Sequence, residues 1–279
     1  MIPHTPKCFQ NHMGLWAIEP TFANSHLKHI QAGMLTADEP EPIHVEDVDG
    51  IRVIHLNGTL MRARSKYGGT STVDARREIA KANRDESVNG IALYVDSPGG
   101  TADGTDELYD TISASEKPVR AYAQYAASAA YWASAGAESI TVPKMGLVGS
   151  LGAYMVLHDT SGAMDEAGVK AYLVSTGGVK GHGADGKVTE ELLAEAQKIV
   201  DFSDSFFAAA VQEGRGLSEE DEAAIHTGAM FTPQEALDNG LIDGISSFSE
   251  FLSTFADDVR PKKSERMSKA DARLQGYRR

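Results

Sequence analysis

The sequence predicts an α/β fold built from repeated βα units, and three observations support this. Short apolar runs alternate with amphipathic stretches along most of the chain. The 279 residues are 42% hydrophobic, with 27 Gly and 10 Pro, which is typical of a globular protein with a large core. Turn residues follow the apolar runs, as at Ser97 to Gly100. This alternation places the loops of a functional site at the ends of the strands.

The individual elements follow from these patterns. Apolar runs predict strands at 51–56, 90–95, 119–123, 139–142, 152–157, 169–174 and 241–244. Helical spacing predicts helices at 72–84, 101–115, 127–135, 160–167, 190–213 and 233–239. The helix at 190–213 is the longest of these and has an apolar stripe that includes Phe206 and Phe207. A stripe of this kind is typical of a core or a subunit interface.

Composition divides the chain into three segments. Residues 1–45 are expected to be an appendage and linker, because an amphipathic stretch leads into a Pro- and acid-rich run at 38–42. Residues 46–256 form the main domain. Residues 257–279 are expected to be a basic, disordered tail, since eight Lys/Arg face two Asp/Glu from Val259 to Arg279.

Charge and cysteine content exclude several classes of function. The chain carries a net charge of −14 although its tail is basic, so an acidic main domain is not expected to bind nucleic acid. No stretch reaches the roughly 18 to 20 apolar residues of a membrane span, and no signal peptide is visible, so we expect a cytoplasmic protein without a membrane anchor. The single cysteine, Cys8, excludes an internal disulfide and lacks the turn chemistry of a catalytic thiol.

Four segments have the residue types that catalysis needs. The turn Ser97-Pro98-Gly99-Gly100 can present backbone N–H groups to an oxyanion, although a plain tight turn explains it as well. Ser128 is flanked by small residues at a helix start, where it could also be an N-cap. Gly146 to Gly152 is a glycine-punctuated segment that contains Ser150. A Gly-rich loop holds Lys180, and most lysines in loops are simply solvated charges.

Taken in order, these segments resemble the signal peptide peptidase A family of serine proteases, which includes the head maturation proteases of tailed phages and prophages. The resemblance covers about 51–251. The serine of the family's Ser-Gly/Ala-Ala-Tyr segment corresponds to Ser128, and its Gly-Ser-Ile-Gly segment corresponds to Gly149-Ser150-Leu151-Gly152. Its Ser-Gly-x-x-Lys pattern matches Thr176 to Lys180 apart from Thr for Ser, and Gln234 to Asp243 resembles its closing helix and strand.

The resemblance implies a Clp protease/crotonase-like βα superhelix and a serine endopeptidase without cofactor or metal. Ser128 would be the nucleophile and Lys180 the general base, with Ser150 orienting the lysine. Backbone N–H groups near Gly99, Gly100 and Ala129 would form the oxyanion hole. A lysine side chain has an ordinary pKa of about 10.4, so a site that uses it as a base must favour the neutral amine.

Several alternatives remain open at this point. A histidine, His182 or His158, could replace the lysine as the base. The phage branch is favoured because no membrane anchor is visible and Leu15 to Pro20 resembles the start of prophage head proteases. Its substrates would be scaffold, portal or capsid proteins, and its location the host cytoplasm or the procapsid. Other possibilities are a bacterial cytosolic signal-peptide peptidase, a non-catalytic capsid assembly protein and a crotonase-fold acyl-CoA enzyme. A homo-oligomer is expected.

Overall fold

The computed structural model describes residues 15–20, 28, 42–65 and 68–260. Its main sheet has a parallel centre in the order β10 (Leu147–Gly149), β8 (Val119–Ala127), β6 (Gly90–Ser97) and β3 (Ile51–Asn57). The antiparallel strands β12 (Met230–Phe231) and β2 (Val45–Val48) lie at its two ends. The strand β9 (Ser139–Val142) branches from β8 and is followed by β13 (Gly244–Ile245). The parallel centre confirms the predicted α/β class.

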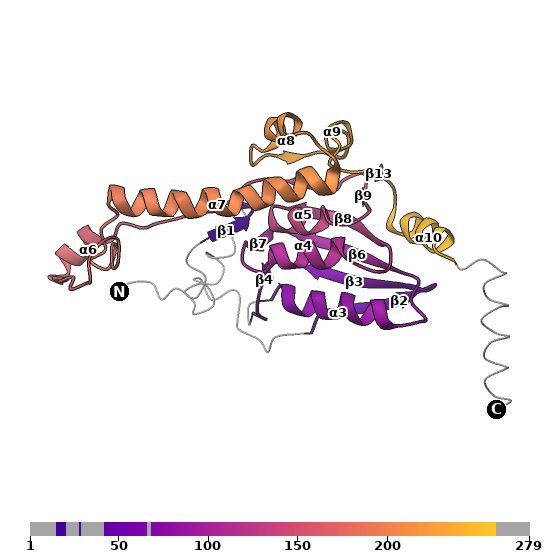
Figure 1. Cartoon of the computed structure of the whole chain (residues 1–279), viewed down its shortest axis with the longest axis horizontal. Coiled ribbons are helices and arrows are strands. Elements are labelled where there is room, and N and C mark those ends of the chain that lie inside the picture. The colour runs from indigo at the N-terminus through magenta and orange to yellow at the C-terminus, as the bar shows by residue number, and fades with distance from the viewer. Residues whose placement is uncertain (1–14, 21–27, 29–41, 66–67, 261–279) are drawn as a thin grey trace, which may run out of the picture.

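Helices cover both faces of this sheet. The helices α3 (Thr72–Arg84), α4 (Thr105–Ser113) and α5 (Ala129–Ser134) each follow a strand and pack on one face (Figure 1). Because side chains alternate along a strand, Ile54 and Leu56 face these helices, while Ile51 and Val53 face α10 (Phe248–Asp258). The predicted α3 has the same bounds, and its cap is Ser71, whose side chain accepts from the Asp74 amide.

A second, small sheet lies beside the carboxyl ends of β6 and β8. Its strand order is β11 (Tyr154–Met155), β1 (Leu15–Ile18), β7 (Gly99–Thr101), β4 (Leu60–Met61) and β5 (Thr70–Ser71). The sequence patterns predicted β11 within a longer strand and did not predict the other four. The predicted boundary of an N-terminal appendage at residue 45 stays a prediction, but β1 of that segment pairs with the main domain.

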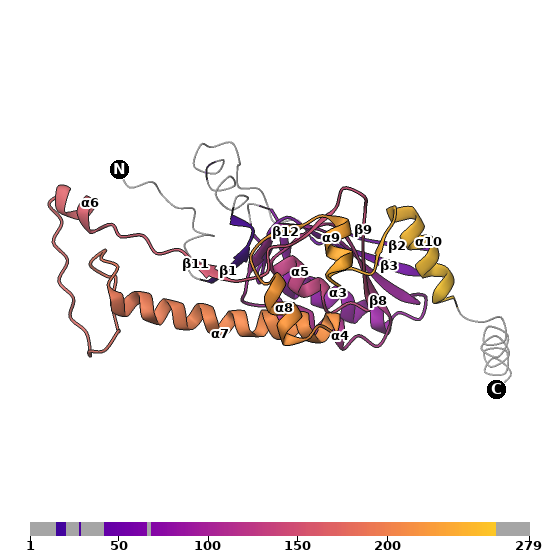
Figure 2. The same cartoon turned by 90° about the horizontal axis from the view of Figure 1, so that it is seen from above.

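The helix α7 (Glu190–Arg215) joins two different environments. Its C-terminal half packs on α5 with Phe207, Ala210 and Val211 buried, and a methyl group added at Gly214 would lie 2.0 Å from the Ala135 carbonyl oxygen. Its N-terminal half extends away from the sheets together with α6 (Ser161–Glu166), as Figures 1 and 2 show. We call residues 156–202 the arm.

The arm contains the clearest error of the sequence prediction. Residues 169–174 were expected to form a strand but have no regular structure, and Tyr172 and Val174 are 84% and 95% exposed. A strand needs a neighbour for its backbone groups, and the arm supplies none at this segment. The apolar pattern is present, but no part of the chain that the structure describes covers Tyr172 or Val174.

The chain closes with two short helices and α10. Ser218 caps α8 (Glu219–Ile225), and a capping box of Thr232 and Glu235 begins α9 (Pro233–Asp238). Neither α8 nor α10 was predicted. Among the described residues, no helix is long and apolar enough to cross a membrane. Cys8 and residues 261–279 of the predicted basic tail lie outside the described ranges.

Candidate active site

Ser128 lies where β8 ends and α5 begins. Its backbone has φ 53° and ψ −121°, a conformation that costs a non-glycine residue on the order of 1–3 kcal/mol. It occupies the N-cap position of α5, yet its side chain makes no capping hydrogen bond. Its Oγ instead lies 3.4 Å from the Gly152 carbonyl oxygen. A strained serine whose hydroxyl does not cap the helix is the geometry of a nucleophile at a strand-to-helix turn.

The turn at Gly99 lies directly beside Ser128. Gly99 has φ 94°, and a methyl group added there would lie 3.0 Å from the Ala129 nitrogen and 2.8 Å from the Ala127 oxygen. Ala129 is the first residue of α5, so its N–H has no acceptor within the helix. The Gly99 N–H donates to Ser97 Oγ at 3.2 Å, which fixes the turn. The structure therefore brings the glycine turn and Ala129 together beside the serine.

The loop of Gly149 to Ala153 forms the opposite side of the site. The Ser128 N–H donates to the Gly149 oxygen at 2.7 Å, and Ser150, which also has positive φ (52°), donates its N–H to the Ala229 oxygen at 2.7 Å. Both serines are buried. The predicted Ser150 therefore lies in a strained loop whose backbone oxygens contact Ser128 at two points.

A partly buried cluster of His226, Glu222 and Asp204, which the sequence did not indicate, contacts this loop. His226 Nδ1 lies 2.5 Å from Glu222 Oε1, and His226 Nε2 lies 2.9 Å from Asp204 Oδ1. Asp204 also accepts from the Ala153 N–H at 3.1 Å. Burial lowers the pKa of His226, but the hydrogen bonds and charges of Asp204 and Glu222 outweigh it and raise that pKa overall. With a carboxylate at each ring nitrogen, His226 is suited to fix the loop rather than to accept a proton from Ser128.

The structure does not bring Lys180 to Ser128 within one chain. Lys180 is exposed in a turn of the arm, and among the described residues no hydrogen bond or ion pair joins it to the serine. His158 and His182, the alternative bases, also belong to the arm. The arm extends away from both sheets (Figure 2), whereas Ser128 follows directly on β8 of the main sheet. Within the described ranges of one copy, the structure therefore brings the glycine turn and Ala129 beside Ser128 but joins neither Lys180 nor these two histidines to it.

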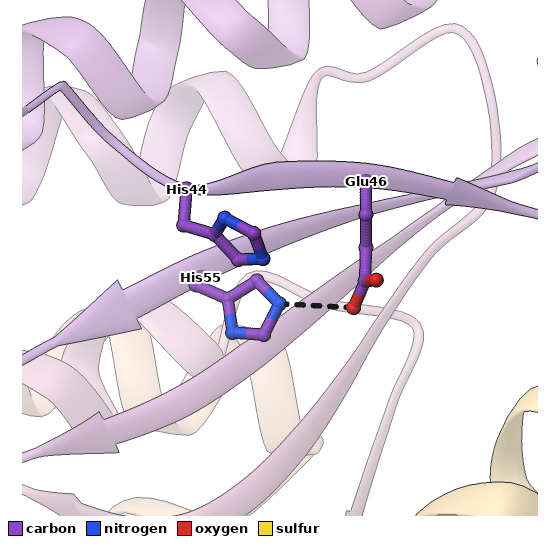
Figure 3. Close-up of side chains that lie close together, drawn as sticks. All are labelled: His44, Glu46 and His55. Atoms are coloured by element: carbon purple, nitrogen blue, oxygen red, sulfur yellow. Dashed lines mark hydrogen bonds and ion pairs between the residues drawn. The ribbon is translucent and has the colours of Figure 1, made fainter.

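Only one group within the described ranges has the composition and spacing of a metal site. It consists of His44, Glu46 and His55, whose ligand atoms all lie within 4.8 Å of one another. Figure 3 shows the Glu46 carboxylate directed at His55 and the two imidazole rings close together, with centroids 4.5 Å apart and planes tilted by 57°. Glu46 belongs to β2, His55 to β3 and His44 directly precedes β2, at the far edge of the main sheet from β12. Sequence spacing did not reveal it, because a hairpin brings the two histidines together.

A strained serine between a strand and a helix, beside a glycine turn, is the arrangement of enzymes that transfer acyl groups through a serine. The profile of Peptidase family S49 matches residues 111–261, which is more than half of the chain. The chain belongs to peptidase family S49, and the predicted resemblance to the signal peptide peptidase A family is confirmed.

Three curated relatives illustrate the family. Protease 4 of Salmonella typhi is 28% identical over 221 residues, covering 76% of this chain and 35% of that protein. Capsid assembly protease C of Escherichia phage lambda is 29% identical over 232 residues, covering 78% and 51%. Head-tail preconnector protein GP5 of Enterobacteria phage P21 is 32% identical over 222 residues, covering 75% and 43%. The chain thus spans about a third to a half of the length of these relatives.

Solved structures also align with the chain. An enoyl-CoA hydratase/isomerase family member is 13% identical with a TM-score of 0.49, covering 78% of this chain and 75% of that one. The ClpP protease catalytic domain from Plasmodium falciparum is 11% identical with a TM-score of 0.45, covering 71% and 85%.

Proposed function

We propose that this chain is a serine endopeptidase in which Ser128 is the nucleophile and Lys180 of a neighbouring copy is the general base. The observation that supports it best is the strained, uncapped Ser128 beside Gly99 and Ala129. Lys180 Nζ would take the proton of Ser128 Oγ while that oxygen attacks the scissile carbonyl carbon. The oxyanion would accept hydrogen bonds from the Ala129 N–H and the glycine turn. The lysine would return the proton to the leaving amine, and water would hydrolyse the acyl-enzyme.

The exposed apolar side chains of the arm and of the adjoining α7 support a second copy as the source of the lysine. Large apolar residues that are about half exposed or more lie along both: Val156, Val169, Tyr172, Leu173, Val174, Val179, Leu193, Ile199, Phe202 and Phe206. Soluble proteins rarely leave so many neighbouring apolar side chains uncovered, except at interaction surfaces. An arm that docks on the next copy makes a head-to-tail contact, which closes into a ring when the rotation allows.

Docking would also explain how a lysine can act as a base. An exposed lysine is protonated at neutral pH and cannot accept a proton from serine. Transfer of the amine from water into a contact with the next copy favours its neutral form. Hydrolysis would then depend on assembly, which suits a protease that must act only within a forming particle.

The names of two relatives support the substrate class. Capsid assembly protease C and Head-tail preconnector protein GP5 are phage proteins of the head and its connector. We therefore propose polypeptides of a phage head, such as scaffold, portal or capsid proteins, as substrates. The alternative is signal-peptide hydrolysis, because another relative of this chain is named putative signal peptide peptidase SppA.

The dyad is tested by hydrolysis of a denatured protein between pH 6 and pH 10. Ser128→Ala and Lys180→Ala are expected to be inactive, while Lys170→Ala and Lys187→Ala, which remove other exposed lysines of the arm, retain activity. Activity retained in Lys180→Ala but lost in His182→Ala would move the base to the histidine.

Supply of the lysine by a neighbour is tested by mixing the two inactive variants. Assembled together from equal amounts, Ser128→Ala and Lys180→Ala subunits should recover about one quarter of the wild-type activity, because one neighbour pair in four unites an intact serine with an intact lysine. No recovery, with both variants assembled normally, would show that the lysine acts on its own serine. Co-expression with head and scaffold proteins from the same genome, compared with a synthetic signal peptide, tests the substrate class.

A further inference from the structure

The strand β1 occupies an unusual place in the small sheet. It lies between β7 and β11 and runs antiparallel to both, with Ala17 opposite Gly100, Ile18 opposite Gly99 and Trp16 opposite Tyr154. Ala17 and Ile18 are buried. Neighbouring strands lie about 4.8 Å apart, so without β1 the facing edges of β7 and β11 would be separated by a slot one strand wide. The backbone groups of both edges would then need another extended chain as partner.

This slot borders the candidate active site at one end. One wall, β7, contains the glycine turn beside Ala129, and the other wall, β11, begins two residues after Gly152, whose oxygen lies 3.4 Å from Ser128 Oγ. The strand β1 runs toward Ser128, since its last residue, Ile18, pairs with Gly99.

The residues after β1 stay beside the site. The Glu19 N–H donates to the Pro98 oxygen at 2.8 Å. Burial raises the pKa values of Tyr125 and Tyr154, and the Glu19 carboxylate raises both further. Tyr125 lies three residues before Ser128. An extended chain in the slot therefore leads its backbone past the nucleophile.

We propose that the slot between β7 and β11 is the peptide-binding groove and that β1 is an internal inhibitor that fills it. A substrate would enter by strand addition and replace β1, since its backbone can form the same hydrogen bonds with both walls. This inference rests on the proposed peptidase function and adds its regulation. In this view residues Leu15 to Pro20 compete with substrate, and hydrolysis requires their withdrawal from the groove.

A reversible disulfide tests whether β1 must leave. Trp16 and Tyr154 face one another across the β1–β11 pair, so Trp16→Cys with Tyr154→Cys, in a Cys8→Ser background, provides a suitable cross-strand pair. The oxidised protein should lose at least about 10-fold in peptide hydrolysis, and reduction should restore it. The matched control is Asp47→Cys with Arg52→Cys across β2 and β3, where oxidation should change nothing. Equal activity of the oxidised and reduced Trp16/Tyr154 pair would overturn the proposal.

A release variant and a binding measurement separate this proposal from the proposed function. In Ser128→Ala, which cannot hydrolyse peptide, Ala17→Asp places a charge at a fully buried position and should expel β1. A fluorescent peptide of sequence Leu-Trp-Ala-Ile-Glu-Pro should bind Ser128→Ala/Ala17→Asp at least about 10-fold more tightly than Ser128→Ala. Circular dichroism of both proteins checks that the main domain stays folded.

The outcomes are distinct. Tighter peptide binding by the release variant, with no hydrolysis by any protein that has Ser128, would preserve the groove and refute the peptidase. Hydrolysis by the wild type, with equal peptide binding in both Ser128→Ala proteins and no effect of the disulfide, would preserve the peptidase and make β1 a permanent strand.

Independently, the side chains in Figure 3 point to a second site. We infer that His44, Glu46 and His55 bind one zinc ion. His55 Nε2 and Glu46 Oε1 lie 3.3 Å apart, and two ligands of tetrahedral zinc at about 2.0–2.1 Å from the metal are separated by about 3.4 Å. His44 and Glu46 are exposed at the sheet edge, so their side chains can rotate to close the remaining distances.

The chemistry of the three side chains fits this metal. Two imidazoles and one carboxylate form a common protein ligand set for zinc, with the fourth position left to water or another ligand. The Tyr94 ring, 5.0 Å from that of His55, closes the inner side. Bound zinc would link His44, which precedes β2, to His55 of β3.

Titration calorimetry with zinc chloride tests the site. The wild type should bind zinc in a process that His44→Ala, His55→Ala and Glu46→Gln each weaken more than about 100-fold, since even outer partners of zinc ligands contribute 10–100-fold. His158→Ala, which removes an exposed histidine of the arm, should bind as the wild type does. Zinc should also raise the melting temperature of the wild type by about 5 °C. Binding that is unchanged in the exposed-site variants His44→Ala and Glu46→Gln, or absent in the wild type, would overturn the inference.

Discussion

The surroundings of Ser128 and the arm are organised in opposite ways. Around Ser128 small and aromatic side chains are buried, and backbone hydrogen bonds fix a strained serine between two loops. In the arm, by contrast, many apolar side chains face solvent. The residues around Ser128 are already packed within one chain. The exposed apolar side chains of the arm would be buried only by contact with another molecule. A peptidase whose nucleophile and base belong to these two regions would be inactive until its copies assemble.

The largest expected effect is a loss of catalytic activity, which is compared with the effect on stability. Ser128→Ala and Lys180→Ala should each lower kcat/KM by more than about 10⁴-fold. Lys180→Ala should leave the free energy of unfolding within about 0.5 kcal/mol of the wild type, because the side chain is exposed in the arm. Urea unfolding followed by circular dichroism, beside peptide hydrolysis, measures both. A large loss of stability in Lys180→Ala would mean that the arm is part of the folded core.

Two adjacent residues of α7 lie close to the point where the arm meets the packed body, so their substitution compares the two regions. Phe207 is fully buried and stacks on Trp132 with ring centroids 5.0 Å apart, while Phe206 is 51% exposed. Phe207→Ala should cost about 3–5 kcal/mol of stability through lost burial and a cavity. Phe206→Ala should cost little stability but shift sedimentation toward smaller assemblies. Unchanged sedimentation in Phe206→Ala would remove this residue from the subunit contact.

The His226 cluster should make stability depend on pH. The pKa of His226 is raised in the folded protein, so its stabilisation is fully present below the unfolded value of about 6.5 and is lost as pH rises through the folded value. His226→Ala, which leaves the buried Glu222 without its partner, should cost about 3 kcal/mol at pH 6 and less at pH 9. Thermal unfolding at both pH values, with His158→Ala as control, measures this. A loss of stability in His226→Ala that increases with pH would contradict a raised pKa of His226 in the folded protein.

The smallest expected effects come from removing two helix caps, one in each region. Ser71 caps α3 in the body and Thr189 caps α7 in the arm, each accepting from a backbone amide. Ser71→Ala should lower global stability by about 1 kcal/mol. Thr189→Ala should speed hydrogen exchange in the first turns of α7 and leave global unfolding unchanged, because that end of the helix opens locally. Equal effects on global unfolding would show that the arm and the body unfold as one unit.

Much of the body could be predicted from the sequence because its signals are local. The alternation of apolar runs and amphipathic stretches predicted β3, α3, β6 and β8, and the bounds of α3 were correct. The glycine turn and Ser128 were also recognised, since a turn and its neighbours are encoded within a few residues. Longer elements such as α7 showed helical periodicity whether their side chains were buried or exposed. Periodicity therefore identified the helix but could not say which apolar residues face solvent.

The sequence by itself determined that the chain alternates strands and helices and that a serine and a glycine turn fall at strand ends. Only the tertiary structure decided that β1 lies between β7 and β11, that His226 contacts Asp204 behind the Ser128 loop, and that the arm, which includes Lys180, extends away from the sheets. These features join segments that are far apart along the chain. Their formation depends on which surfaces pack together, and no local pattern of residues specifies that choice.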